Sequence, residues 1–231
     1  MKIGMRLGFG YGIVVAMIII LGIVLFIKLA DVDESMQDIQ HDKFPKTVLA
    51  NDVIDNINVI ARAMRNLIIW GEEVRETELK RIEEARAIII AKLDTLDKRI
   101  TTKEGREKIQ NVFDARKVYV QGQDEFLNYV KEGKIEEAKS FMQTTLRKDQ
   151  NEYLSNVNKL IHYQVELMDV SGEKADSAIN SLKTIAIVLI IVSVIVAIIV
   201  AFFITRGITK PIFATIDRKS TRLNSSHRIR S

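Results

Sequence analysis

Two arginines and two asparagines recur at helical spacing within one predicted helix, and their side chains are suited to binding an anion. At about 100° per residue, Asn51, Asn58, Arg62 and Arg65 fall on one face, roughly 150° from the apolar stripe centred near Ile57. A guanidinium group is a planar fork that pairs with a carboxylate through two hydrogen bonds. The same pattern is also typical of a solvated charged face. The face is therefore either a binding surface or an ordinary exposed surface.

Other residues that could bind metal or take part in catalysis form no recognisable site in the sequence. His41 and His162 lack a partner at the three- or four-residue spacing of a two-ligand metal face, and the chain has no cysteine. Acidic pairs such as Glu83-Glu84 are typical of exposed helix faces. The sequence contains no nucleophile and base arrangement, phosphate loop or dinucleotide fingerprint. We therefore predict a protein that is not an enzyme and that has no metal site and no cofactor.

Two long apolar runs without a charge bracket the segment that carries the arginines. The first covers residues 7–27 and the second covers residues 184–205. Each exceeds the roughly 18 to 20 residues that a helix needs to cross the core of a bilayer. The first run is longer than the apolar part of a signal peptide, and no small-residue cleavage site precedes Lys28. We therefore predict transmembrane helices at 8–28 and 184–205.

Charge is distributed unevenly around these two runs. Residues 1–7 carry two basic residues and no acid, and residues 206–231 carry seven basic residues and one acid. The segment 31–183 has 24 basic and 29 acidic residues, a net charge of −5. Basic flanks favour retention on the cytoplasmic side of the membrane. The sequence thus predicts a cytoplasmic N-terminus at 1–7 and a periplasmic domain at 29–183. Because topology accounts for the basic ends, we predict no nucleic-acid partner.

Apolar residues between the two spans recur at steps of three and four, which is the period of an amphipathic helix. Four such stripes are present. They comprise Val53, Ile57, Ile60, Met64 and Leu67; then Leu79, Ile82, Ile89, Leu93, Leu96 and Ile100; then Ile109, Phe113, Val120, Leu127 and Val130; and then Tyr153, Val157, Leu160, Leu167, Ser171, Ala175, Ala178 and Leu182.

Short breaks separate the stripes at 70–73, 101–104 and 131–134, and short connections make neighbouring helices antiparallel. We expect Thr101 to cap the third helix and Trp70 to pack at the tip. The predicted fold is all-α, an antiparallel four-helix bundle flanked by two transmembrane helices.

Several short motifs resemble those of one protein family. Residues 2–10, Lys-Ile-Gly-Met-Arg-Leu-Gly-Phe-Gly, resemble the opening of bacterial methyl-accepting chemotaxis receptors. Residues 62–67, Arg-Ala-Met-Arg-Asn-Leu, and 133–138, Gly-Lys-Ile-Glu-Glu-Ala, resemble the four-helix-bundle sensor domain of these receptors. Residues 206–212, Arg-Gly-Ile-Thr-Lys-Pro-Ile, resemble the first residues of a HAMP linker. The order and spacing of these motifs carry the resemblance, which covers about residues 1–216.

The C-terminal end departs from the family pattern. Residues 206–216 match only the start of a HAMP linker, and no methylation helices or signalling tip follow. Ser, Arg and Asn dominate 217–231 without heptad order, so we expect this stretch to be a non-native tail. Contacts with a downstream adaptor and kinase would require the missing cytoplasmic region.

The resemblance implies a homodimer that binds its ligand between arginines of the first helix and polar residues of the last. Counting residues from each predicted span gives an independent estimate of how far a residue lies from the membrane along the bundle. Arg65 lies about 36 residues beyond the first span, and the same distance back from Lys183 reaches Arg147. Arg65 should therefore be level with 144–151, which also offers Lys148 and Asn151. The predicted ligand-binding residues are Asn58, Arg62, Arg65, Thr144 and Thr145.

The resemblance implies a multi-pass receptor of the bacterial inner membrane. We expect it to sense a small anionic metabolite, such as an organic acid or an amino acid, and to relay the signal by a small helix displacement into a cytoplasmic module. One alternative is the sensory front end of a histidine kinase or cyclase. Another is a membrane-anchored coiled-coil protein without a ligand.

Overall fold

The computed structural model describes the backbone of residues 3–227 and the side chains of Met5 and residues 8–207. All regular structure in this part of the chain is helical. Residues 34–173 form one compact unit, and the residues before and after them form a second unit. The helices are α1 (Ile3–Gln37), η1 (Asp38–Lys43), α2 (Phe44–Trp70), η2 (Gly71–Val74), α3 (Arg75–Arg99), α4 (Lys103–Lys131), α5 (Ile135–Phe141), η3 (Met142–Leu146) and α6 (Arg147–His227).

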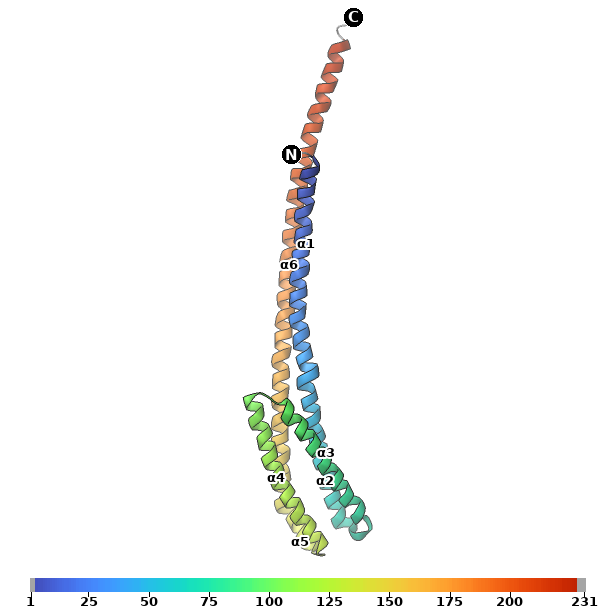
Figure 1. Ribbon diagram of the computed structural model, residues 1–231, viewed down its shortest axis with the longest axis vertical. Helices are drawn as coiled ribbons and strands as arrows, with labels where there is room; N and C mark the ends of the chain where they lie inside the picture. Colours follow the sequence, from blue (N-terminus) through green and yellow to red (C-terminus); the bar gives the residue numbers. More distant parts are fainter. Residues whose placement is uncertain (1–2, 228–231) are drawn as a thin grey trace. The chain divides into compact units, whose positions relative to one another are not determined.

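The unit formed by residues 34–173 is the predicted antiparallel four-helix bundle. Helices α2, α3 and α4 provide three of its helices, and α5, η3 and the start of α6 together provide the fourth (Figure 1). Gly71 and Gly133, in the turns after α2 and α4, have φ angles of 59° and 74°, which favour glycine. Both turns fall at breaks that the sequence predicts.

The core of the bundle follows the predicted stripes on α2 and α3. Val53, Ile57 and Leu67 are at most 1% exposed. On α4 the two ends of the predicted stripe, Ile109 and Val130, are buried, but its members Phe113, Val120 and Leu127 are only partly buried. Between the two ends, the fully buried apolar residues are instead Val112, Tyr119 and Phe126, each one position earlier.

Two glycines also lie on the buried face of α4. Gly105 and Gly122 are both buried, and a Cβ added at Gly122 would lie 3.1 Å from Cδ1 of Leu146. Because these positions have no side chain, that side of α4 approaches its neighbours closely. A stripe drawn through large apolar residues alone does not include them.

Two local predictions at the turns are wrong. The N-cap of α4 is Thr102, not Thr101: Thr102 has an extended backbone, and its Oγ1 accepts a hydrogen bond from the Gly105 N–H at 3.1 Å. Thr102 Oγ1 also lies 2.8 Å from the Tyr163 hydroxyl, which fixes this turn to α6. Trp70 does not pack at the tip of the bundle, because its side chain is 60% exposed.

The chain enters α2 through a π-helical turn and a proline. Pro45 lies in the first turn of α2, directly after η1. Proline has no N–H to donate to the carbonyl of His41 four residues earlier. Arg99, at the end of α3, donates to that carbonyl through Nη2. Pro45 thus acts structurally here, and its lost backbone hydrogen bond is replaced by a side chain from a neighbouring helix.

The same end of the bundle contains a network of ion pairs, here named the charge cluster, made of Asp38, Asp42, Lys43 and Lys46. Lys43 Nζ lies 2.7 Å from Asp38 Oδ1 and 2.8 Å from Asp42 Oδ2, and Lys46 Nζ lies 2.7 Å from Asp42 Oδ2. Lys46 is only 5% exposed. Ser171 Oγ donates to Asp38 Oδ2 at 2.7 Å. The cluster therefore connects the first and last helices of the bundle.

The second unit contains the two apolar runs. Two helices among the described residues are long and apolar enough to cross a membrane, and their apolar windows are not buried in protein. A Cβ added at Gly10 would lie 2.7 Å from both Ile204 Cδ1 and Val200 Cγ1, so α1 and α6 pack closely there.

Three predicted segments lie largely outside the described side chains. The predicted HAMP start at 206–216 has described side chains only at Arg206 and Gly207, and the predicted tail at 217–231 lies outside the described side chains. The N-terminal segment 1–7 is described in side chain only at Met5.

Candidate functional site

A groove of about 530 Å³ lies between α2 and the helix formed by α5, η3 and α6. We name it the cation groove after its polar lining. Three cations and three amides line it: Arg65, Lys139, Arg147, Gln143, Gln150 and Asn151. Apolar residues, among them Met64 and Leu146, form its floor at the edge of the core. A mixed lining of this kind can hold a small polar molecule with an apolar body.

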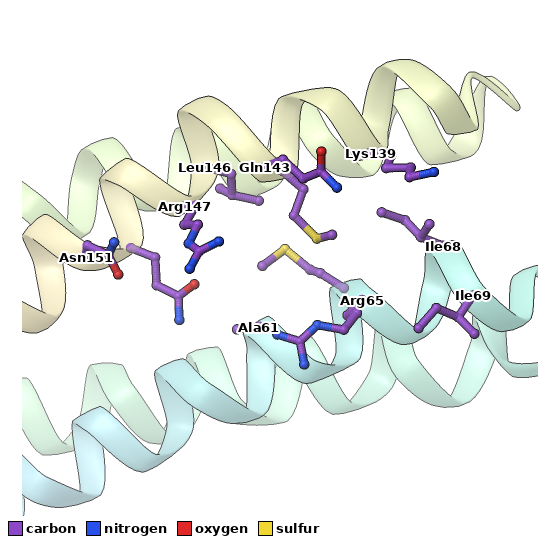
Figure 2. Close-up of a pocket in the computed structure, with 12 residues that line it drawn as sticks. Ala61, Arg65, Ile68, Ile69, Lys139, Gln143, Leu146, Arg147 and Asn151 are labelled. Atoms are coloured by element: carbon purple, nitrogen blue, oxygen red, sulfur yellow. The ribbon is translucent and has the colours of Figure 1, made fainter.

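The two arginines occupy equivalent places on facing helices. Arg65 follows the buried Met64, and Arg147 follows the buried Leu146. Each guanidinium is therefore carried at the rim of the core instead of on the far side of its helix. Figure 2 shows Arg147 reaching into the space between the helices, with Arg65 on the opposite helix.

The π-helical turn η3 sets the phase of the fourth helix at the groove. Ala138 and Leu146 are both buried and are eight residues apart, whereas a heptad pattern would place the second core residue at Thr145. A π-helical turn accommodates one additional residue, and such turns are frequent at functional sites. The additional residue moves Leu146 into the core and leaves Arg147 at the groove.

The groove has a positive charge that the protein does not neutralise. Among the described residues, Arg65 and Arg147 make no hydrogen bond or ion pair, and no acidic residue lines the groove. Lys139 has only a long contact of 3.8 Å with Glu136, and both side chains are exposed. Unengaged guanidinium groups in a partly apolar groove favour an anion that can accept paired hydrogen bonds.

Of the five predicted ligand-binding residues, only Arg65 lines the groove. Asn58 and Arg62 lie on α2 outside its lining, with Arg62 exposed. Thr144 Oγ1 donates to the carbonyl of Ser140 at 2.8 Å, which is the ordinary bond of a mid-helix threonine to the preceding turn. Thr145 is exposed and also lies outside the lining.

Arg147 is the main groove residue that the predicted set lacks. Residue counting does place Arg147 and Asn151 level with Arg65, and both line the groove. The helical phase at Arg147 depends on η3, and a uniform α-helical period cannot anticipate a π-helical turn. Gln143 lies within the same turn and Gln150 follows it, whereas Lys139 precedes it on α5.

The bundle consists of long antiparallel helices with an open polar groove on one side, and the chain also carries two long apolar helices. The family model described as "four helix bundle sensory module for signal transduction" matches residues 1–179, and the chain belongs to this family. The match confirms the predicted resemblance to the sensor domain of methyl-accepting chemotaxis receptors. The family is one of signalling modules, not of enzymes. A search of the curated proteins found no match.

Proposed function

We propose that the chain is the sensory and membrane portion of a homodimeric bacterial chemoreceptor that binds a small carboxylate in the cation groove. The protein would cross the inner membrane twice and expose the bundle to the periplasm. The observation that supports this proposal most strongly is the pair of unengaged arginines, Arg65 and Arg147, in a groove without an acid.

The size and lining of the groove favour an organic acid or an amino acid. A cavity of about 530 Å³ lies within the usual range for small-molecule sites. Arg65 and Arg147 would pair with carboxylate oxygens from opposite sides, while Gln143 and Asn151 would offer donors and acceptors to other polar groups. Met64 and Met142 have flexible, polarisable side chains that adapt to the carbon skeleton of a ligand.

A second copy of the chain would cover the exposed face of α2. Phe44, Val48, Arg62 and Ile69 are exposed on this helix at spacings compatible with one face. Apolar residues at both ends of a helical face favour packing against a partner helix. In such a dimer Asn58 and Arg62 of the partner would approach the groove, and Thr144 and Thr145 would lie near its rim.

Helix α6 provides a continuous route from the groove to the second apolar run. It begins at Arg147 and remains helical beyond residue 205. A ligand changes the signalling state only through its different affinities for two helix arrangements. Shifts of about 1 to 2 Å at helix interfaces are typical of such transitions. The output module would receive this shift through the linker that begins at Arg206.

Calorimetric titration of the full chain in lipid nanodiscs with succinate, malate, citrate and acetate tests the proposal. We expect at least one multivalent carboxylate to bind, and Arg65→Ala and Arg147→Ala to weaken it by about 10- to 150-fold, since a charged hydrogen bond contributes about 1.5 to 3 kcal/mol.

Lys148→Ala is the matched control, because Lys148 is exposed beside Arg147 but does not line the groove. Arg62→Ala distinguishes a site within one chain, which it would leave intact, from a site shared with the partner. Equal affinity in the wild type and in both groove variants would reject the site, and no binding of any acid would favour the ligand-free alternative.

A further inference from the structure

The lining of the cation groove changes in character along the length of the bundle. Figure 2 shows Asn151 at one end and Ile68 and Ile69 at the other, with Arg65 and Arg147 between them. One end therefore offers amide groups, the middle offers two guanidinium groups, and the other end offers apolar side chains. A ligand that fills the groove meets these three environments in a fixed order, so the groove selects for a molecule with a polar and an apolar end.

The apolar end is formed by side chains that the fold leaves partly uncovered. Ile69 lines the groove and is 60% exposed, and Ile68 and Met142 are partly buried against the core. Arg65 and Ile69 are four residues apart on one α-helix, which corresponds to about 6 Å along its axis. An apolar group of about that length, attached to a carboxylate held at Arg65, would cover these side chains and remove apolar surface from water.

Lys139 is also at the apolar end, but its charge is directed away from the middle of the groove. Its side chain is 49% exposed, and its Nζ lies 3.8 Å from Glu136 Oε2. Figure 2 shows this side chain extending away from the two arginines. A lysine in such a position adds its methylene stem to an apolar surface while its ammonium group stays in water. The apolar end therefore does not require a second anionic group on the ligand.

The groove offers no counter-charge to an ammonium group. Among the described residues that line it, none is acidic. Asp149 follows Arg147 by two residues, but its Oδ2 would lie 3.5 Å from a Cβ added at Gly122, so this carboxylate lies against α4 instead. The α-ammonium group of a bound amino acid would lie next to the carboxylate that the two arginines hold. It would therefore be repelled by both guanidinium groups, with no carboxylate of the groove to offset the repulsion.

We propose that the ligand of the cation groove is a carboxylate with an apolar body and without an ammonium group. Its carboxylate pairs with Arg65 and Arg147, and its apolar body lies along Ile68 and Ile69. The reverse orientation would place the apolar body against the amides and leave the isoleucines uncovered. This inference rests on the proposed function and narrows it, because it separates amine-free organic acids from amino acids of the same size.

Calorimetric titration of the full chain in lipid nanodiscs with 4-methylpentanoate, leucine and acetate tests the ligand class, with empty nanodiscs as the blank. The first two acids share a carbon skeleton and differ only in the α-ammonium group. We expect 4-methylpentanoate to bind at least about 10-fold more tightly than acetate, because its methyl and methylene groups leave water. It should bind at least about 5-fold more tightly than leucine, because leucine adds the repelled positive charge.

Three variants test the orientation of the ligand. Ile69→Ser should weaken the binding of 4-methylpentanoate by about 2- to 5-fold and leave that of succinate, which has no apolar end, unchanged. Ile90→Ser is the matched control, because Ile90 is also exposed, on α3, and does not line the groove. Asn151→Asp keeps the shape of the side chain and adds a negative charge, so it should reduce the preference for 4-methylpentanoate over leucine by at least about 3-fold.

The inference is overturned if leucine or acetate binds as tightly as 4-methylpentanoate, or if Ile69→Ser binds 4-methylpentanoate as the wild type does. Succinate then separates this inference from the proposed function. If succinate still binds in a manner that depends on Arg65 and Arg147, the groove remains the ligand site and only the narrower ligand class is wrong. If none of the acids binds, the proposed function fails as well.

Discussion

The charge cluster and the cation groove occupy different parts of the same bundle. The cations of the cluster are paired with carboxylates, whereas the arginines of the groove are not. In the charge cluster, Lys43 and Lys46 lie within 2.8 Å of carboxylate oxygens, and Lys46 is almost completely buried. In the cation groove, Arg65 and Arg147 have no protein partner among the described residues. Both regions join the first and last helices of the bundle.

The difference separates charges that are paired within the fold from charges that remain available for the proposed ligand. A buried cation requires a partner, because removal of the partner leaves an uncompensated charge in a region of low dielectric constant. An exposed guanidinium at the rim of a groove stays hydrated and loses little when it is unpaired. Mutations in the charge cluster should therefore change stability, and mutations in the groove should change binding.

The largest expected effect on stability follows Asp42→Ala. Among the described residues, the substitution leaves Lys46 without its only carboxylate partner and removes one of two partners from Lys43. Because Asp42 is itself 38% exposed, we expect a loss of about 1 to 2 kcal/mol in the free energy of unfolding, measured with urea and circular dichroism. Asp55→Ala, an exposed acid on α2, is the control and should stay within about 0.5 kcal/mol. Equal losses in the two variants would refute the structural role of the cluster.

We expect low pH to reduce the free energy of unfolding by a smaller amount than Asp42→Ala does. A hydrogen bond from Lys43 lowers the pKa of Asp38, and although burial raises the pKa of Asp42, its hydrogen bonds from Lys43 and Lys46 outweigh burial and lower it. A lowered pKa in the folded state means that the stabilisation is present above the unfolded pKa, near 4, and is lost as the pH falls through the folded values.

Unfolding of the wild type and of Asp38→Asn/Asp42→Asn between about pH 2 and pH 7 measures this effect. The stability of the wild type should fall more steeply below about pH 4 than that of the double variant. Parallel curves in this range would show that the cluster does not contribute to acid sensitivity.

The smallest effect on stability is expected in the groove. Arg65→Ala and Arg147→Ala remove no hydrogen bond or ion pair among the described residues, so the free energy of unfolding should change by at most about 0.5 kcal/mol. The same urea titration measures it, and Asp42→Ala provides the contrasting result. A loss above about 1 kcal/mol in either variant would indicate that the groove arginines stabilise the bundle and would weaken the comparison.

Periodicity was sufficient to predict the architecture, because the helix period and the length of the apolar runs can both be determined from short, continuous stretches of sequence. The stripe from Val53 to Leu67 is buried as predicted, and the turns at Gly71 and Gly133 fall at predicted breaks. The phase of α4 was ambiguous from large apolar residues, since Val112, Tyr119 and Phe126 form a heptad series directly beside Phe113, Val120 and Leu127, and only the first series is fully buried.

The candidate site was predicted only in part for a related reason. Arg65 lies on an unbroken α-helix and lines the groove, but Asn58 and Arg62 were assigned to the same face of that helix and lie outside the lining. Arg147 was missed because η3 inserts one residue into the helical phase.

The additional residue in η3 has a consequence for how sequences of this kind can diverge. Deletion of one residue within Met142–Leu146 would let the helix continue with ordinary α-helical bonds, so the change need not break the chain's secondary structure. It would rotate the two halves of that helix by about 100° relative to each other and advance one half by about 1.5 Å. A single-codon deletion in a homologous gene would thus change which side chains line the cation groove, with no substitution of the lining residues.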